Sequence, residues 1–279
     1  MGLEADRSVP WASQARPNRA PPFYLNIPTN RFTSLDMMKP AKFFLIFLVL
    51  AGLSIQAAGS TEIRCLWVTR WAFRSEDDLQ RILSDAAQLG FTDVFLQVRG
   101  ECDALYASGL EPWAEPLTGT LGKDPGWDPL KTAIEIAGKY GLRLHAWINV
   151  LTAWHVSKKG TPPSLKSHIF LSHPEWILCN RHGKPMSIVR SHSRSNYAFL
   201  NPASPARTHI IEVVKDIVSN YAIDGLHLDY IRFPDTSYAY PSPQLKGAVD
   251  LDDDSLRAES ITTLIRAIRE VIHPHHIPL

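Results

Sequence analysis

The chain has 279 residues and an almost balanced charge, with 29 Lys and Arg against 28 Asp and Glu and a formal net charge of +1. Its 45% hydrophobic and 10% aromatic residues are typical of a globular protein and exclude a disordered tail. Because the charges nearly cancel, the composition provides no strong positive field that would favour binding to nucleic acid or to an anionic membrane. Cys65, Cys102 and Cys179 form no CxxC pair, so neither a disulfide framework nor a zinc site is expected.

The first sixty residues contain the features of a secretory signal. A basic stretch at 37–42 precedes an uninterrupted apolar run at 43–55, and small residues follow it. The run is shorter than the roughly 20 residues that span a bilayer, although a membrane anchor is the alternative. We therefore expect a signal peptide at 37–59, a secreted, periplasmic or cell-envelope location, and no stable membrane span after cleavage. Residues 1–36 are expected to be a mis-assigned start or a disordered leader.

From residue 61 to the end, short β-like runs alternate with amphipathic helices. Strands are predicted at Ile63–Thr69, Asp93–Arg99, Leu142–Val150 and Gly225–Phe233. Helices are predicted to follow the caps Ser75, Asp128 and Ser204, and a fourth to start near Leu256. Residues 151–203 are expected to form a long loop. Such an alternation predicts βαβ units and a parallel sheet.

Two architectures fit this pattern: an open doubly wound sheet and a TIM barrel. The doubly wound sheet usually has a glycine-rich first turn, but residues 70–74 contain no glycine. A complete barrel takes about 250 residues, whereas 61–279 holds four complete βα units. We therefore predict an α/β fold, a (β/α)8 TIM barrel truncated after about four βα units. An inactive fragment with an exposed edge strand is the alternative.

The predicted strands carry polar side chains on one face. The apolar positions Val94, Leu96 and Val98 alternate with Phe95, Gln97 and Arg99, and the later strands place His145, Trp147, Asn149, His227 and Asp229 on the same polar side. Strands covered on both faces of a parallel sheet are normally apolar throughout. We therefore expect the polar side to face the barrel interior and to end at the carboxyl-terminal mouth, where barrel enzymes have their sites. A polar plug, with Arg99 paired to Asp229, is the structural alternative.

Asp229 is the strongest catalytic candidate, because a carboxylate at the carboxyl end of an inner strand is held toward an incoming ligand. A nearby Arg99 or Arg232 would keep it ionised, which favours a nucleophile or charge stabiliser over an acid. The long loop adds Trp154, His155, Trp176 and Asn201, whose aromatic members can stack on sugar rings. No HExxH, GxSxG or P-loop motif occurs, so no metal or other cofactor is expected.

Several short motifs follow one another in order: QVR at 97–99, HAWIN at 145–149, LNP at 200–202 and DGLHLDY at 224–230. This series resembles the glycosyl hydrolase-like 10 family of bacterial exported proteins, from about residue 62 to the end. The resemblance implies a TIM-barrel glycoside hydrolase, whose best-understood type cleaves peptidoglycan glycan strands stripped of peptides. It implies a catalytic Asp229 and, around the same mouth, Gln97, Arg99, His145, Asn149, Asn201 and His227; we add Arg232 as a substrate-binding candidate.

Glycosidases generally need a second carboxylate. Glu101, Asp103 and Asp235 are candidates within the chain, and a residue beyond Leu279 is the alternative. We expect an exported glycoside hydrolase that acts on a polysaccharide, with peptidoglycan glycan strands as one candidate. A non-catalytic carbohydrate-binding barrel of the cell envelope is the alternative from a different functional class.

Overall fold

A computed structural model describes residues 62–193, 195–245 and 251–279. The expected leader at 1–36 and signal peptide at 37–59 lie outside the described residues. Among the helices in the described ranges, none combines the length and the hydropathy that a membrane span requires.

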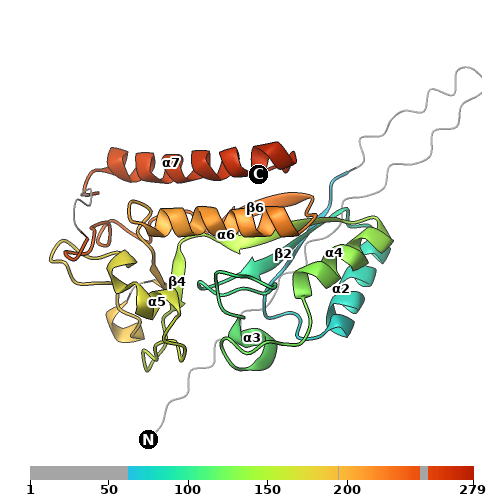
Figure 1. The fold of residues 1–279 in the computed structure, drawn as a ribbon, viewed down its shortest axis with the longest axis horizontal. Coiled ribbons are helices and arrows are strands. Elements are labelled where there is room, and N and C mark those ends of the chain that lie inside the picture. Colours follow the sequence, from blue (N-terminus) through green and yellow to red (C-terminus); the bar gives the residue numbers. More distant parts are fainter. Residues whose placement is uncertain (1–61, 194, 246–250) are drawn as a thin grey trace, which may run out of the picture. The chain divides into compact units, whose positions relative to one another are not determined.

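Four parallel strands form the main sheet in the order β1-β2-β3-β6 (Figure 1). They are β1 (Cys65–Val68), β2 (Asp93–Arg99), β3 (Arg143–Asn149) and β6 (Gly225–Asp229). The four predicted strands and the parallel α/β pattern are thus confirmed, whereas the strands described do not close into a barrel. β6 ends earlier than predicted, because Tyr230 adopts a φ of 51°, which leaves the extended conformation.

Four long helices alternate with these strands: α2 (Glu76–Gln88), α4 (Pro129–Tyr140), α6 (Ala206–Asn220) and α7 (Asp254–Ile272). Two begin at the predicted caps, where Ser75 Oγ accepts the backbone N–H of Asp78 at 3.2 Å and the Asp128 carboxylate accepts that of Lys131 at 3.1 Å. α2 packs against α4, and α6 against α7 (Figure 1). The core includes the apolar alternate residues of the strands, namely Val94, Leu96, Val98, Leu144, Ala146, Ile148 and Leu226.

The opposite face of the sheet carries aromatic and histidine side chains. Trp67 stacks on Phe95 with ring centroids 4.7 Å apart, and Phe95 stacks on His145 at 4.5 Å. His227 meets Phe95 edge-on at 5.1 Å. Trp67 is 50% exposed, so this face is accessible within the described structure. The predicted alternation between an apolar face and a polar, aromatic face is therefore present.

The long segment at 151–203 contains strands that were not predicted. β4 (Thr152–His155) pairs antiparallel with β5 (Tyr197–Phe199), and we call this pair the β4–β5 ribbon. Short helical turns complete the structure: α3 (Glu115–Thr118), α5 (Ile169–Ser172), η1 (Pro174–Trp176), η2 (Arg190–His192) and η3 (His273–His275). The expectation of a strand-free loop was wrong because strands of four and three residues are too short to show a periodic pattern.

Candidate active site

Two of the predicted side chains, Asn149 and Asp229, end their strands at the same edge of the sheet, and the register pairs them directly. Gln97 lies just below them on β2, because it pairs with Trp147, two residues before Asn149. Gln97 and Asn149 are buried, whereas Asp229 is partly exposed. Asn149 Oδ1 is buried without a hydrogen-bond partner among the described residues. A buried unpaired acceptor of this kind is a candidate contact for a ligand hydroxyl.

The backbone is strained immediately after two of these strands. Tyr230, after β6, and Cys102, after β2, both have left-handed conformations, with φ values of 51° and 58°. This conformation costs a residue other than glycine roughly 1–2 kcal/mol. The Tyr230 backbone N–H donates to Asp229 Oδ1 at 2.7 Å, so the turn also orients the carboxylate. Strain of this kind concentrates at functional sites.

A pocket of ≈ 340 Å³ lies next to the end of β6. It is lined by Ser195, Asn196, Tyr197, Tyr230, Arg232, Pro234 and Asp235. The Tyr197 and Tyr230 rings meet edge-on at 5.2 Å, and the Arg232 guanidinium lies 5.5 Å from the Tyr230 ring. Arg232 is therefore part of the pocket wall. Aromatic rings beside polar groups can stack on sugars and hydrogen-bond to them.

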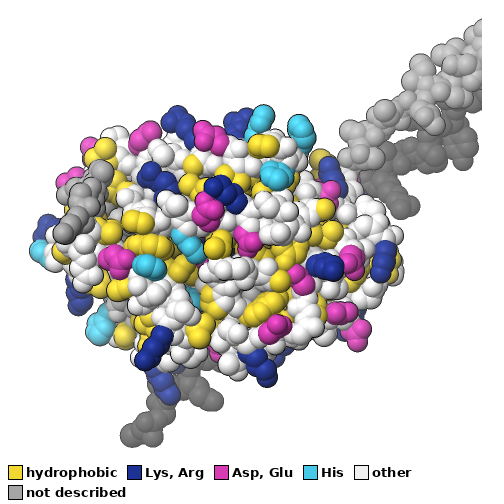
Figure 2. Space-filling view, in the orientation of Figure 1, with side chains coloured by type: hydrophobic (Ala, Val, Ile, Leu, Met, Phe, Trp, Pro, Cys, Tyr) yellow, Lys and Arg dark blue, Asp and Glu magenta, His cyan; other side chains and the backbone are white. Residues whose placement is uncertain are grey.

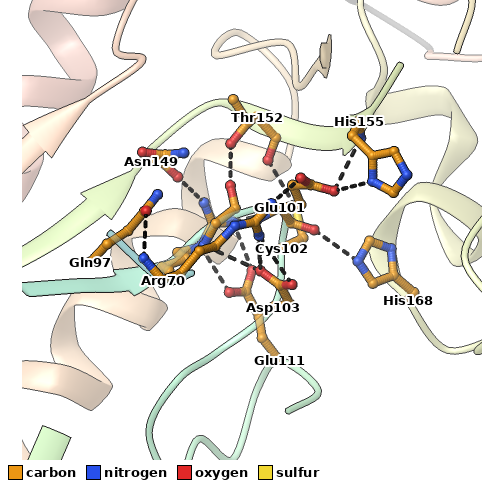
Figure 3. A network of polar contacts seen from close by, with 12 residues as sticks. Arg70, Gln97, Glu101, Cys102, Asp103, Glu111, Asn149, Thr152, His155 and His168 are labelled. Atoms are coloured by element: carbon orange, nitrogen blue, oxygen red, sulfur yellow. Dashed lines mark hydrogen bonds and ion pairs between the residues drawn. The ribbon is translucent and has the colours of Figure 1, made fainter. Parts of the chain in front are cut away.

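A buried ion network lies under the same edge (Figure 3). The Arg70 guanidinium pairs with Glu101 and lies 3.3 Å from Asp103 Oδ1. Burial alone would raise the pKa of Glu101, but His155 and Arg70 outweigh it and lower that pKa. Burial raises the pKa of Asp103 against the opposing charge of Arg70. Two of the three candidates for the second catalytic carboxylate, Glu101 and Asp103, are thus engaged with Arg70.

The network is joined to the strand ends and to the β4–β5 ribbon. Gln97 Oε1 accepts the backbone N–H of Arg70 at 3.1 Å. Glu101 Oε2 lies 2.7 Å from His155 Nδ1 and accepts the backbone N–H of His155 at 3.1 Å. The hydrogen bond that His155 makes to Glu101 raises the pKa of His155, while burial opposes this effect.

Arg99 does not pair with Asp229, although its Nη1 donates to the backbone oxygens of Asn149 and Val150 at the end of β3. The β2–β3 register shifts between Gln97 and Arg99, so Arg99 pairs with Ile148 instead of Asn149. Paired residues of neighbouring strands face the same side, and the shift therefore turns Arg99 away from the polar face. It is 1% exposed and forms an ion pair with Glu111 at 2.7 Å. The expected mouth position of Arg99 and its pairing with Asp229 are both corrected.

His145 also lies away from the strand ends. His145 pairs with Gly225, which lies four residues before Asp229. His145 is therefore about 13 Å from the level of Asp229, measured along the strands. Its Nε2 lies 2.8 Å from Asp93 Oδ1 at the start of β2. The expectation that His145 contributes to the mouth is therefore corrected as well.

His227 and Asn201 occupy intermediate positions. His227 lies two residues before Asp229 and pairs with Trp147. Burial lowers the pKa of His227, although Asp229 opposes this effect. Asn201 is fully buried, and its Oδ1 accepts the backbone N–H of Ala203 at 2.9 Å in the turn before α6. No hydrogen bond between described residues joins Asn201 to Asp229.

Charged side chains of both signs are interspersed on the face shown in Figure 2. Within the described ranges, no three His, Cys, Asp or Glu side chains come together in a group that could hold a metal ion.

Several residues of the site were not predicted, among them Arg70, Tyr197 and Tyr230. Arg70 is the second residue after β1, and its place at a strand end is the signal that could have indicated it. Tyr197 had no comparable signal, because β5 is only three residues long.

The fold and the site together define a parallel α/β domain with a carboxylate and an aromatic pocket at the carboxyl-terminal edge of its sheet. The family model of glycosyl hydrolase-like 10 matches residues 62–272, more than half of the chain, and the chain belongs to this family.

Curated relatives carry corresponding names. The chain is 28% identical over 203 residues to glycosyl hydrolase YngK of Bacillus subtilis, a match that covers 67% of the chain and 36% of the relative. It is 30% identical over 155 residues to glycosyl hydrolase DigH of Escherichia coli, covering 53% of the chain and 32% of the relative. The chain thus spans about a third of these proteins. The family and the named relatives support a glycoside hydrolase-like function.

Solved structures show a likeness of fold. An α-L-fucosidase of Paenibacillus thiaminolyticus, 19% identical, superposes with a TM-score of 0.50 over 76% of the chain and 30% of its own length. A GH36 α-galactosidase of Geobacillus stearothermophilus, 17% identical, gives 0.50 over 76% of the chain and 27% of its own. The described sheet and helices therefore match part of glycoside hydrolase domains.

Proposed function

We propose that this chain hydrolyses glycosidic bonds of a polysaccharide, with Asp229 as nucleophile or as stabiliser of developing positive charge. The observation that carries the proposal is the register that pairs Asp229 with Asn149 at the strand ends, next to the pocket walled by Tyr197 and Tyr230. Gln97 and Asn149 would hold sugar hydroxyls at this edge. Export to the cell envelope belongs to the proposal and rests on the apolar run at 43–55.

The surroundings of Asp229 suit this role. Its Oδ1 accepts the Tyr230 backbone N–H, which fixes the orientation of the carboxylate. Burial lowers the pKa of His227, on the same strand, which favours the uncharged imidazole over one that would form an ion pair with Asp229. An oxocarbenium-like transition state places positive charge on the anomeric carbon, where a fixed carboxylate attacks it or stabilises it.

The substrate we propose first is peptidoglycan glycan strands freed of their peptides, which rests on the family resemblance. The test is release of reducing ends from these strands and from common plant and algal polysaccharides. Asp229→Asn should lower kcat by on the order of 10³-fold or more while leaving glycan binding intact. Asp252→Asn, at an exposed position, is the control and should retain full activity. Unchanged activity of Asp229→Asn would overturn the assignment.

A non-catalytic carbohydrate-binding function is the second candidate, favoured by the state of the other carboxylates. Glu101 and Asp103 are engaged with Arg70, and Asp235 Oδ1 accepts the backbone N–H groups of Ser237 and Tyr238 at 2.7 and 3.2 Å. Calorimetric binding of glycan strands without release of any reducing ends would support this candidate over the enzyme.

A further inference from the structure

The contact between Glu101 and His155 fixes the tautomer of the imidazole. An ionised carboxylate only accepts hydrogen bonds, and Glu101 is held ionised by Arg70 and His155. His155 Nδ1 therefore carries the hydrogen that faces Glu101 Oε2 at 2.7 Å. Nε2, the other ring nitrogen, makes no hydrogen bond to any residue that the structure describes.

The two partners differ sharply in their access to solvent. The Glu101 side chain is 4% exposed, whereas the His155 side chain is 40% exposed. The buried negative charge thus acts on an imidazole whose outer nitrogen can meet a ligand. Figure 3 shows His155 at the outer end of the network that begins at Arg70.

The β4–β5 ribbon connects His155 with the pocket. His155 pairs with Tyr197 in the ribbon register, and the Tyr197 ring contacts that of Tyr230. Tyr230 directly follows Asp229. The accessible imidazole is therefore linked, through its ribbon partner Tyr197 and the Tyr230 ring, to the strand end that carries Asp229.

We propose that His155 is the catalytic proton donor of this site and that Glu101 is its positioning residue. The proposal rests on the proposed glycoside hydrolase function. His155 would be the proton-transfer group that acts beside Asp229. Glu101 and Asp103 do not provide this group directly, because both are engaged with Arg70.

In the proposed reaction, proton transfer from His155 accompanies cleavage of the glycosidic bond. His155 Nε2–H gives its proton to the glycosidic oxygen while the bond from that oxygen to the anomeric carbon breaks, and the electron pair of this bond remains on the oxygen. Asp229 attacks or stabilises the positive carbon. Water then adds to that carbon, and one of its protons passes to His155 Nε2. Where Asp229 has bonded to the carbon, that bond breaks as water adds, and its electron pair returns to the Asp229 carboxylate.

Groups on several elements set the charge state of His155. The Glu101 hydrogen bond and charge, and the charge of Glu115 on α3, favour the imidazolium, whereas burial and Arg70 disfavour it. The hydroxyl-bearing ring of Tyr197 lies across the ribbon. The Glu101 hydrogen bond is the largest of these effects and raises the pKa, so His155 can hold its proton closer to neutral pH than a free histidine.

The test compares two substrates in His155→Gln. Glycan strands have a poor leaving group that needs a proton, whereas the dinitrophenyl glycoside of the same sugar does not. We expect kcat/KM for glycan strands to fall by about 10²–10⁴-fold and the value for the aryl glycoside to change less than about tenfold. The alkaline limb of the pH–rate profile should disappear in His155→Gln and move to lower pH in Glu101→Gln.

His173→Gln is the matched control. His173 is 44% exposed and also contacts a carboxylate, with Nδ1 3.1 Å from Glu175 Oε1, but it lies between α5 and η1 and not on the β4–β5 ribbon. His173→Gln should leave kcat/KM for both substrates and the pH–rate profile unchanged. If Glu101→Gln fails to fold, the half-exposed His155→Gln carries the test, with its urea midpoint compared to that of the parent.

The outcomes separate the two proposals. Equal losses on both substrates, or an unaltered alkaline limb in His155→Gln, would overturn the role of His155 while an active parent protein upholds the hydrolase function. A parent that releases no reducing ends would overturn the hydrolase function and the proton donor with it. An Nε2–H tautomer of neutral His155 in a ¹⁵N NMR titration would overturn the pairing with Glu101 independently of activity.

Discussion

Arg99 and Glu111 form a bidentate ion pair in the interior of the protein. Arg99 Nε donates to Glu111 Oε2 at 2.8 Å, and Nη2 donates to Oε1 at 2.7 Å. His209 Nε2, from α6, lies 3.0 Å from the same Oε1. The pair thus joins the end of β2, the loop that follows it and α6, with both charged side chains removed from solvent.

Arg99→Met should lower the free energy of unfolding by about 3–5 kcal/mol, because it leaves the buried Glu111 charge without its partner. Arg143→Met is the matched control: Arg143 pairs with Asp93 at 2.7 Å but its side chain is 53% exposed. The control should lose less than about 1 kcal/mol. Urea unfolding measures both values, and similar losses in the two variants would contradict the structural role of Arg99.

The same pair predicts a loss of stability in acid. Burial alone would raise the pKa of Glu111, but Arg99 and His209 outweigh it and lower the pKa to about 2. Because the folded pKa is below the unfolded one, the contribution is complete above pH ~4.5 and is lost as the pH falls toward 2. It amounts to about 3 kcal/mol. Unfolding free energies measured between pH 6 and pH 2 should fall less steeply in Glu111→Gln than in the parent.

Gly100 provides the space for the Arg70 guanidinium. A Cβ atom at this position would lie 1.9 Å from Arg70 Nη1 and 2.5 Å from its Cζ. Gly100→Ala should therefore displace the guanidinium from Glu101 and lower the free energy of unfolding by about 3–5 kcal/mol. Gly109→Ala meets nothing within 4 Å and should be close to neutral. Equal thermal midpoints for these two variants would show that Arg70 adjusts without loss.

Tyr197 is expected to bind sugar through its ring. Its ring forms the pocket wall together with Tyr230. Tyr197→Ala should weaken binding of soluble glycan oligomers by about tenfold, which corresponds to the loss of one aromatic contact. Tyr197→Phe keeps the ring and should bind within about twofold of the parent. Isothermal titration calorimetry measures the affinity of the parent and of both variants. Equal affinities for all three proteins would exclude the Tyr197 ring as a sugar contact.

The sheet was predictable because its signals are local. β2 has the predicted bounds, and α4 starts after the Asp128 cap and ends before Gly141, because caps and periodic apolar residues act within a few positions of the chain. That Asn149 and Asp229 lie at the same edge also followed from the sequence, since the carboxyl ends of parallel strands share one edge, whereas their direct pairing comes from the structure.

The remaining features depend on distant parts of the chain. The register shift that turns Arg99 toward Glu111 depends on the pairing with β3, and the sequence of β2 contains no signal that predicts it. Glu101 and His155 are 54 positions apart, and only the β4–β5 ribbon brings them together. Strict alternation placed Arg99 at the mouth because it ignores the register shift. The family resemblance placed His145 there, although His145 lies four residues before Asn149 on β3.

The residues of the proposed site are divided between the main sheet and the β4–β5 ribbon. The main sheet holds Asp229, whereas the ribbon and its connecting turns carry His155 and Tyr197 on a separate pair of short strands. Changes in length or composition between these strands would remodel one wall of the pocket without disturbing the parallel strands. Grafting residues 151–203 from a relative is therefore a direct way to exchange selectivity among members of the family while the scaffold is retained.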